Sequence, residues 1–269
     1  MTRIQEEFYS PADYEFLQAN NLETFSKLWE VELNWFEPPN YRRSGWSGAA
    51  RHELRRKNGE LVGVFIKRQE NHKSRILRYP AGCPTFRIEW QNYKKLTHLQ
   101  IGVPRQLYYG ENENRAIIIT YELDGFTSLD EWLRRNQSPQ LRRAVLPAIT
   151  DVVRRFHDLR FRHNSLYPKH IMLKVHQDGN LNATDVRFID LEKSRRVFFA
   201  VGARIRDLDS LLRRCSEWTS HEKDLFLNYY LKAGLEHLPP LQLAEKLWRI
   251  PLVKWVKRRM AVNEKKHKV

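Results

Sequence analysis

Two short strands interrupt the otherwise helical second half of the chain. The segment "IMLKVHQDGNLNATDVRFIDL" (171–191) carries two apolar, β-branched runs around a "QDGN" turn, which is the pattern of a β-hairpin. The polar stretch "HDLRFRHNSLYPKH" (157–170) precedes it, and Asp190 follows its second run. Any fold for this half must therefore place a small hairpin between a histidine-containing loop and a carboxylate.

The first half is typical of strands with an inserted helix. Residues 41–68 contain turn signals at "SGWSG" and "KNGE", then an apolar run that ends in Lys67, which predicts a hairpin followed by a strand. Residues 85–99 have apolar side chains at helical spacing, and residues 101–123 predict two strands joined by a polar "GENENR" turn.

Helices are predicted at four further places. A short helix is expected over residues 11–32, with Asn20 and Asn21 as candidate caps. "SLDEWLRR" predicts a capping box from Ser128 to Glu131, and "LRRAVLPAITDVVRRFHDLRF" predicts a long amphipathic helix that bends near Pro147. "ARIRDLDSLLRR" (203–214) predicts an amphipathic helix whose apolar stripe comprises Leu208, Leu211 and Leu212.

The organisation expected from these elements is bilobal. With 269 residues and 41% hydrophobic content, the chain can bury one large core or two smaller ones. We expect an N-terminal lobe over residues 1–124, a mainly helical lobe over residues 125–253 and a basic tail over residues 254–269. Cys83 and Cys215 are far apart and lack metal-ligand spacing, so two buried thiols in a reducing compartment are expected. The sequence shows no signal peptide and no membrane-spanning run, which predicts a cytoplasmic protein.

The charge predicts an anionic partner. The formal net charge is +15, which suits nucleic acid, an acidic membrane surface or a phosphorylated small molecule. Nucleic acid is not favoured, because no helix-turn-helix, zinc or RNA-binding motif accompanies the charge. The tail "KWVKRRMAVNEKKHKV" carries Trp255 and Val256 beside basic residues. It is either a peripheral anchor at the inner membrane face or a solvated basic tail.

The motifs resemble those of the protein kinase fold, an α+β fold with a β-rich N-terminal lobe, one key helix and a mainly helical C-terminal lobe. Lys67 ends a strand in "GVFIKR", and Glu89 follows on the predicted helix "TFRIEWQNYKKL". His163 and Asp190 stand where the kinase H-R-D histidine and D-F-G aspartate would stand. The resemblance is closer to the lipopolysaccharide core kinases that act on heptose or Kdo, because Tyr167, His170 and "IDL" match their loops. "LYPKHI" resembles the InaA-type branch of that superfamily, and the resemblance covers roughly residues 14 to 230.

The resemblance implies a site for ATP and Mg²⁺. Lys67, positioned by Glu89, would bind the α and β phosphates of ATP, and the "SGWSG" glycines, Gly45 and Gly48, are either a phosphate-covering turn or an ordinary hairpin turn. Asp190 would bind the metal. His170 has either a role near the metal or phosphate or a structural one, since imidazole is a poorer Mg²⁺ ligand than oxygen.

Ser165 departs from the pattern, because a kinase has its catalytic aspartate at this position. The histidine beside it, His163, is expected to hold the shape of the loop. A serine hydroxyl has no comparable basicity, so a factor of roughly 10²–10⁴ in rate is lost unless another carboxylate replaces it. Candidates for that carboxylate are Asp185, Asp207 and Asp209. An aspartate near the start of the 203–214 helix, Asp207 or Asp209, either accepts hydrogen bonds from the catalytic loop or caps the helix.

Two functions are therefore expected as alternatives. The first is ATP- and Mg²⁺-dependent phosphoryl transfer to a heptose or Kdo sugar of the lipopolysaccharide core, at an anionic glycolipid on the inner membrane face. The second is a pseudokinase, a nucleotide-responsive binding or stress-response module in which Ser165 marks the loss of transfer activity.

Overall fold

The chain divides into two compact units, each with its own core. The computed structural model describes residues 4–42, 45–177, 179–198 and 200–232. The first unit comprises the described residues of Met1–Leu99, Val103–Asp124 and Leu191–Lys193. The second comprises those of Gln100–Gly102, Gly125–Asp190 and Ser194–Val269. The end of the expected helical lobe, from residue 233, and the basic tail with Trp255 and Val256 lie outside the described residues.

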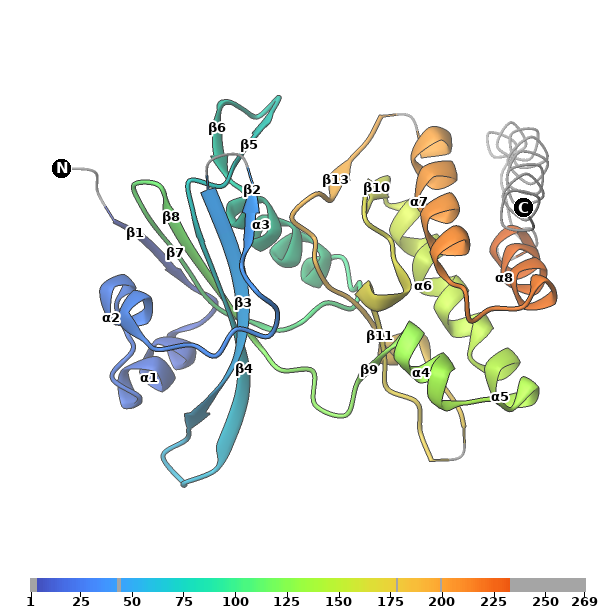
Figure 1. Cartoon of the computed structure of the whole chain (residues 1–269), viewed down its shortest axis with the longest axis horizontal. Helices are drawn as coiled ribbons and strands as arrows, with labels where there is room; N and C mark the ends of the chain where they lie inside the picture. The colour runs from blue at the N-terminus through green and yellow to red at the C-terminus, as the bar shows by residue number, and fades with distance from the viewer. Residues whose placement is uncertain (1–3, 43–44, 178, 199, 233–269) are drawn as a thin grey trace. The chain divides into compact units, whose positions relative to one another are not determined.

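The first unit is built on a six-stranded antiparallel sheet of order β1-β7-β8-β4-β3-β2 (Figure 1). Its elements are β1 (Gln5–Phe8), α1 (Pro11–Ala19), α2 (Phe25–Glu30), β2 (Asn40–Arg42), β3 (Gly45–Arg55), β4 (Leu61–Glu70), β5 (Lys73–Ile76), β6 (Tyr79–Pro84), α3 (Thr85–His98), β7 (Gln106–Asn112) and β8 (Arg115–Tyr121). Strands β5 and β6 form a separate two-stranded sheet. The predicted strand with Lys67, the two strands around "GENENR" and the helix predicted over residues 85–99 are confirmed, although β4 continues past Lys67 to Glu70.

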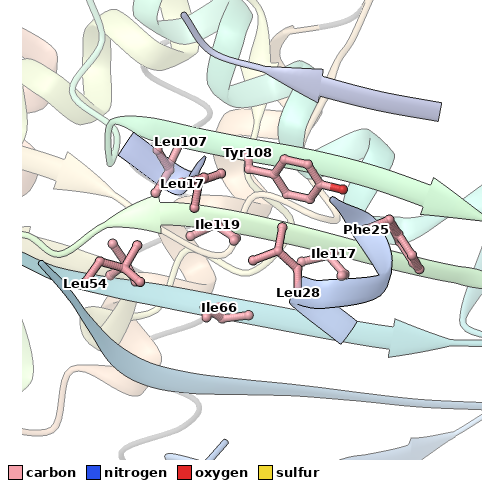
Figure 2. Packing of buried hydrophobic residues seen from close by; sticks show 10 residues of the cluster. Leu17, Phe25, Leu28, Leu54, Ile66, Leu107, Tyr108, Ile117 and Ile119 are labelled. Carbon is pink, nitrogen blue, oxygen red and sulfur yellow. The ribbon is translucent and has the colours of Figure 1, made fainter. Parts of the chain in front are cut away.

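Alternation along β4 directs consecutive side chains to opposite faces of this sheet. Ile66 packs in an apolar cluster with Leu17 of α1 and Leu28 of α2, and all three side chains are fully buried (Figure 2). Lys67, the next residue, forms an ion pair with Glu89 of α3. The helices α1 and α2 therefore cover one face, and α3 covers the other.

The single helix predicted over residues 11–32 is wrong, because two helices occupy this segment. Ser10 caps α1 through its side chain, and Thr24 caps α2 in the same way. Between the helices Asn21 adopts a left-handed conformation with φ of 58°, which a helix interior does not allow. Asn20 is the C-cap of α1, so neither Asn20 nor Asn21 is an N-cap.

The glycines of "SGWSG" belong to a strand and not to a turn. Gly45 begins β3, and Gly48 pairs with Arg68 of β4 inside the sheet. A Cβ atom at Gly48 would lie 2.7 Å from the ring of Trp35, so the small residue allows close packing of that indole. The prediction of an ordinary turn at these glycines is wrong.

The second unit is mainly helical, with short strands. Its elements are β9 (Thr127–Ser128), α4 (Leu129–Arg135), α5 (Pro139–Ala144), α6 (Leu146–Asp158), β10 (Phe161–Arg162), the 3-10 helix η1 (Pro168–His170), β11 (Ile171–Leu173), the 3-10 helix η2 (Ala183–Asp185), β12 (Val186–Phe188), β13 (Arg195–Arg196), α7 (Ala200–Arg214) and α8 (Ser220–Lys232). The expected hairpin is confirmed, because β11 pairs with β12 antiparallel. No helix in the described part of the chain combines the length and the apolar character needed to cross a membrane.

The core of the second unit gathers around α6. The ring of Phe156 on this helix lies 5.0 Å from that of Phe188 on β12 and 5.5 Å from that of Phe161 on β10. The predicted stripe of α7 is buried, with Leu208, Leu211 and Leu212 at most 1% exposed. Both free cysteines are buried as expected.

One helix prediction in the second unit is confirmed in part, and one is wrong. The predicted long helix is interrupted close to the predicted bend, as two helices, α5 and α6, that meet at Val145. Pro147 lies in the first turn of α6, where its missing N–H costs no hydrogen bond. Ser128 is the N-cap residue of α4, but its side chain forms no capping hydrogen bond. The predicted capping box with Glu131 is therefore absent.

Candidate active site

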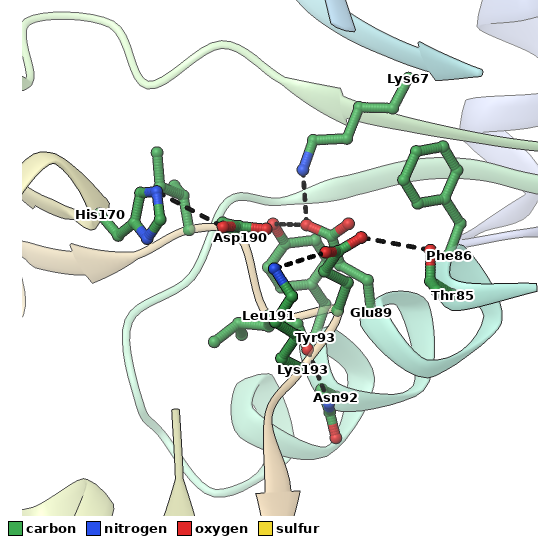
Figure 3. Close-up of polar contacts among 12 residues, drawn as sticks. Lys67, Thr85, Phe86, Glu89, Asn92, Tyr93, His170, Asp190, Leu191 and Lys193 are labelled. Carbon is green, nitrogen blue, oxygen red and sulfur yellow. Dashed lines mark hydrogen bonds and ion pairs between the residues drawn. The ribbon is translucent and has the colours of Figure 1, made fainter. Parts of the chain in front are cut away.

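In the first unit a buried carboxylate holds a lysine. Lys67 Nζ on β4 lies 2.7 Å from Oε1 of Glu89 on α3 (Figure 3). The Glu89 side chain is fully buried, whereas that of Lys67 retains 22% exposure. Tyr93, one turn further along α3, donates its hydroxyl to the same oxygen at 2.7 Å. The structure brings Lys67 and Glu89 together as predicted, and leaves the lysine positioned and partly accessible to a ligand.

The backbone that follows Asp190 is also anchored in the first unit. Asn92 of α3 donates its side-chain amide to the carbonyl of Leu191 at 2.9 Å. The hydroxyl of Thr85, at the start of α3, lies 3.2 Å from Oε2 of Glu192 and donates to it. The helix that carries Glu89 therefore also fixes the segment that begins directly after Asp190.

In the second unit Asp207 of α7 braces the loop that contains His163. Its carboxylate accepts the backbone N–H of His163 at 2.6 Å and that of Asn164 at 3.0 Å. His157 of α6 lies 3.3 Å from the same carboxylate through Nε2, and its Nδ1 lies 2.9 Å from the hydroxyl of Tyr230. Asp207 lies inside α7, so the bracing role is confirmed for this residue and the helix-capping alternative is wrong.

The electrostatics of Asp207 favour its charged form. Burial alone would raise the pKa of this carboxyl, but the hydrogen bond and charge of His157 and the N–H of His163 outweigh it. The net effect is a pKa below the ordinary value. A carboxylate that already accepts three donors is a poor general base, so Asp207 does not suit the role left open by Ser165.

His163 is a neutral, structural histidine. Its Nε2 lies 3.1 Å from the carbonyl of Ile189, which can only accept, so this nitrogen carries the proton. Burial lowers the pKa of His163 to about 4, because a charged imidazolium is poorly solvated there. The hydrogen bond ties the loop to the residue before Asp190. This geometry agrees with the expectation that His163 holds the loop.

His170 and Asp190 form a close pair. Nδ1 of His170 lies 2.8 Å from the carbonyl of Ser165 and must donate to it. Nε2 lies 3.4 Å from Oδ2 of Asp190, so this edge of the ring faces the carboxylate. Asp190 has a left-handed backbone with φ of 59°, and its side chain is 31% exposed. A left-handed aspartate on a loop is uncommon and is often found at functional sites.

Ser165 is buried in the loop. The residue is 3% exposed, and its carbonyl accepts from the backbone N–H of Tyr167 at 2.8 Å as well as from His170. Two of the carboxylates considered as replacements are engaged elsewhere. Asp185 lies 3.1 Å from His176, and Asp209 lies 3.8 Å from Arg213.

The donor set around Asp190 fits a magnesium ion whose ligands come partly from the protein and partly from a nucleotide. No group of three or more His, Cys, Asp or Glu side chains with metal-ligand geometry occurs among the residues that the structure describes. Mg²⁺ is commonly held by one or two carboxylates together with water and substrate phosphates. The partly exposed carboxylate of Asp190 can supply such a ligand, and His170 is placed to orient that carboxylate.

Sequence reasoning missed three residues of these networks: His157, Tyr93 and Asn92. Tyr93 lies four residues after Glu89 on the same helix face, so its spacing could have identified it. His157 is buried at the end of an amphipathic helix, and its partner Asp207 lies 50 residues away. No local pattern indicates that contact.

The chain matches a known protein family over most of its length. Residues 26–230 match the lipopolysaccharide kinase (Kdo/WaaP) family. Protein InaA of Escherichia coli K12 is 34% identical over 181 residues, which cover 64% of this chain and 79% of that protein. The lipopolysaccharide core heptose(I) kinase WaaP of Pseudomonas aeruginosa PAO1 is 27% identical over 177 residues, or 62% of this chain and 60% of that kinase.

Solved structures share the fold. A structure described as WaaP in complex with acyl carrier protein superposes with a TM-score of 0.64 at 22% identity, covering 95% of this chain and 97% of that one. An aminoglycoside-3'-phosphotransferase of type VIII gives a TM-score of 0.51 at 15% identity, covering 92% and 100%. The predicted α+β, protein-kinase-like fold is thus confirmed.

Proposed function

Because the chain belongs to the lipopolysaccharide kinase (Kdo/WaaP) family, we propose that it transfers the γ-phosphate of ATP, with Mg²⁺, to a heptose or Kdo sugar of the lipopolysaccharide core. The observation that carries this proposal is the pair of Lys67 and Glu89 at 2.7 Å, with the carboxylate fully buried. A buried carboxylate that orients a partly exposed ammonium is the arrangement that kinases use to position phosphates.

The residues have separate roles in this proposal. Lys67 binds the α and β phosphates, and Glu89 with Tyr93 keeps its ammonium in place. Asp190 supplies the oxygen ligand for Mg²⁺, which neutralises charge on the phosphates when bound, and His170 orients that carboxylate. Gly45 and Gly48 are given no phosphate contact in this proposal, because a Cβ atom would meet the backbone of Glu70 at Gly45 and the ring of Trp35 at Gly48.

Ser165 sets the expected rate. Its hydroxyl is not a general base at neutral pH, so turnover is expected to be lower by roughly 10²–10⁴ than with an aspartate. Phosphoryl transfer depends mostly on positioning and electrostatics, and both are available from Lys67 and Asp190. We therefore propose slow transfer rather than none.

A pseudokinase is the second candidate function. The burial of Ser165 at 3% exposure favours it, because a side chain that the protein encloses does not meet an acceptor hydroxyl. In this case the chain binds nucleotide and acts as a nucleotide-responsive binding or stress-response module.

We further propose that the chain works in the cytoplasm, at the inner face of the cell membrane. Its acceptor would be an anionic glycolipid, and the formal net charge of +15 supports attraction to such a surface. The basic segment 254–269 would contribute to that attraction.

Nucleotide binding is the first test. Mg-ATP affinity is measured by calorimetry for the wild type, Lys67→Met and Asp190→Ala, with Lys57→Met as a control at an exposed lysine. We expect Lys67→Met to weaken binding at any metal concentration and Asp190→Ala to weaken it only when Mg²⁺ is present. Unchanged affinity in both site variants would refute the nucleotide-site assignment.

Phosphate transfer separates the two candidates. Purified core oligosaccharide is incubated with labelled ATP and the wild type, Ser165→Asp or Asp190→Ala. Transfer by the wild type that Asp190→Ala abolishes would eliminate the pseudokinase. Nucleotide binding without transfer in the wild type would eliminate the kinase.

A further inference from the structure

The hairpin of β5 and β6 projects beyond the six-stranded sheet of the first unit (Figure 1). Ile76 pairs with Tyr79, which leaves Leu77 and Arg78 as a two-residue turn. Leu77 is 96% exposed. Two-residue turns favour Gly, Asn and Asp, so neither turn chemistry nor packing explains a leucine at this tip.

The hairpin is also strongly basic. The sequence from Asn71 to Ile88 contains no Asp or Glu and has lysine or arginine at positions 73, 75, 78 and 87. Lys73, Arg75 and Arg78 are exposed. Among the described residues, these three side chains form no ion pair. They therefore offer three charges to a ligand outside the chain.

The tip end of the hairpin is held against α3, because Tyr79 directly follows the turn. Gln91 of that helix donates to the hydroxyl of Tyr79 at 2.8 Å. The guanidinium groups of Arg78 and Arg87 lie 5.5 and 5.3 Å from the Tyr79 ring, within the range of cation–π attraction. These contacts thus fix the position of the turn that carries Leu77.

We propose that this hairpin docks on an anionic lipid surface, with Leu77 inserted at the headgroup boundary and Arg75 and Arg78 bound to lipid phosphates. An exposed apolar tip flanked by guanidinium groups and a tyrosine is the combination that binds membrane interfaces. The inference rests on the proposed action at a membrane glycolipid, and it names the surface that makes the contact.

A lipid surface fits this hairpin better than an acidic protein does. A stable protein interface buries about 800 Å² on each partner. A two-residue turn with a single large apolar side chain offers much less than such an area. A membrane needs only a few inserted or phosphate-bound side chains, because several weak contacts act together.

Vesicle partitioning of the full chain tests the charges. Vesicles of phosphatidylglycerol with phosphatidylcholine are compared with phosphatidylcholine alone by co-sedimentation. Each basic residue near an anionic surface contributes about 1 kcal/mol, so Arg75→Gln with Arg78→Gln should lower the partition coefficient about 30-fold. Lys57→Gln with Arg143→Gln removes the same charge at two exposed sites elsewhere and should lower it far less.

A fluorescent label tests insertion. The native thiols Cys83 and Cys215 are buried, so Leu77→Cys offers an accessible site for an environment-sensitive dye. We expect a blue shift of the dye on anionic vesicles, and no shift from the same dye at Lys57→Cys.

The outcomes separate the hairpin from the function on which it rests. If the wild type does not bind anionic vesicles, both the proposed membrane location and the proposed role of the hairpin are overturned. The proposed sugar phosphorylation is tested separately, by the transfer assay. If the hairpin substitutions leave vesicle binding unchanged, the proposed role of the hairpin in membrane binding is overturned. Its exposed charges would then suit an acidic protein partner instead. Weakened binding without a blue shift at position 77 would overturn the insertion of Leu77.

Discussion

Replacing Asp207 by asparagine should destabilise the second unit strongly. The carboxylate is 1% exposed and accepts from the N–H groups of His163 and Asn164 and from His157. An amide can accept through one atom only, and its NH₂ group then faces a donor. With the amide oxygen in place of Oδ2, which accepts from His163 and His157, the NH₂ group meets the N–H of Asn164. One hydrogen bond to a charged group is lost and two buried donors are left facing each other, so Asp207→Asn should cost about 3–5 kcal/mol of unfolding free energy.

The assay is urea unfolding followed by circular dichroism at pH 7. The control is Asp151→Asn on α6, because this side chain is 36% exposed and pairs with Arg154 at 3.0 Å. A partly exposed pair of this kind contributes about 0.2–1 kcal/mol. Hydrogen exchange at the amides of His163 and Asn164 should accelerate in Asp207→Asn and not in the control. Equal urea midpoints for Asp207→Asn and Asp151→Asn would refute the bracing role.

Acid titration tests the charge of Asp207 separately. Its pKa lies below the ordinary value of 3.8, so the folded state favours the ionised form more than the unfolded chain does. This contribution to stability is fully present above pH 3.8 and is lost as the pH falls below that value. The stability gap between the wild type and Asp207→Asn should therefore narrow in this acidic range. A gap that stays constant on acidification would contradict a charged Asp207.

Three further perturbations test other parts of the structure. Tyr93→Phe removes the hydroxyl that Glu89 accepts at 2.7 Å and should cost about 1.5–3 kcal/mol in urea unfolding, and a cost near zero would contradict this contact. Arg142→Ala leaves Glu222, its partner at 2.9 Å, buried without that cation. It should cost about 3–5 kcal/mol, and Arg142→Ala with Glu222→Ala should recover part of this loss. Burial raises the pKa of Cys83, and that of Cys215 to about 12, so neither thiol should react with a disulfide reagent at pH 8 before denaturant is added; fast reaction of either would contradict its burial.

Local patterns predicted the elements that carry a regular apolar period or an unbroken apolar run. The helix over residues 85–98 follows the helical period, and the strands around "GENENR" are buried over almost their whole length; all three are confirmed. The helix predicted over residues 11–32 failed because apolar spacing continued past a break. The break consists of the left-handed backbone of Asn21 and the side-chain cap at Thr24. The spacing of apolar residues contains no information about either feature.

The site residues that belong to ordered motifs could be predicted from the sequence. Residues whose roles depend on contacts between distant parts of the chain could not. Lys67 and Glu89 were expected to pair, and they do. The choice between Asp207 and Asp209 was open, because two aspartates two residues apart look alike in sequence and point to different sides of a helix. Only the tertiary fold places Asp207 beneath the loop amides of His163 and Asn164.

The chain passes between the two units several times, and this limits where chimeras of related proteins can be joined. Residues 100–102 belong to the second unit and residues 191–193 to the first, so the chain changes unit after residues 99, 102, 124, 190 and 193. A chimera with a single junction after Asp124 would inherit Asn92 from one parent and Leu191 from the other, and likewise Gly102 and Phe188. Each of these pairs shares a hydrogen bond of 2.9 Å. Recombination at one point therefore has to preserve both pairs. Taking residues 100–102 from the parent of the second unit would reunite Gly102 with Phe188, and taking residues 191–193 from the parent of the first unit would reunite Asn92 with Leu191.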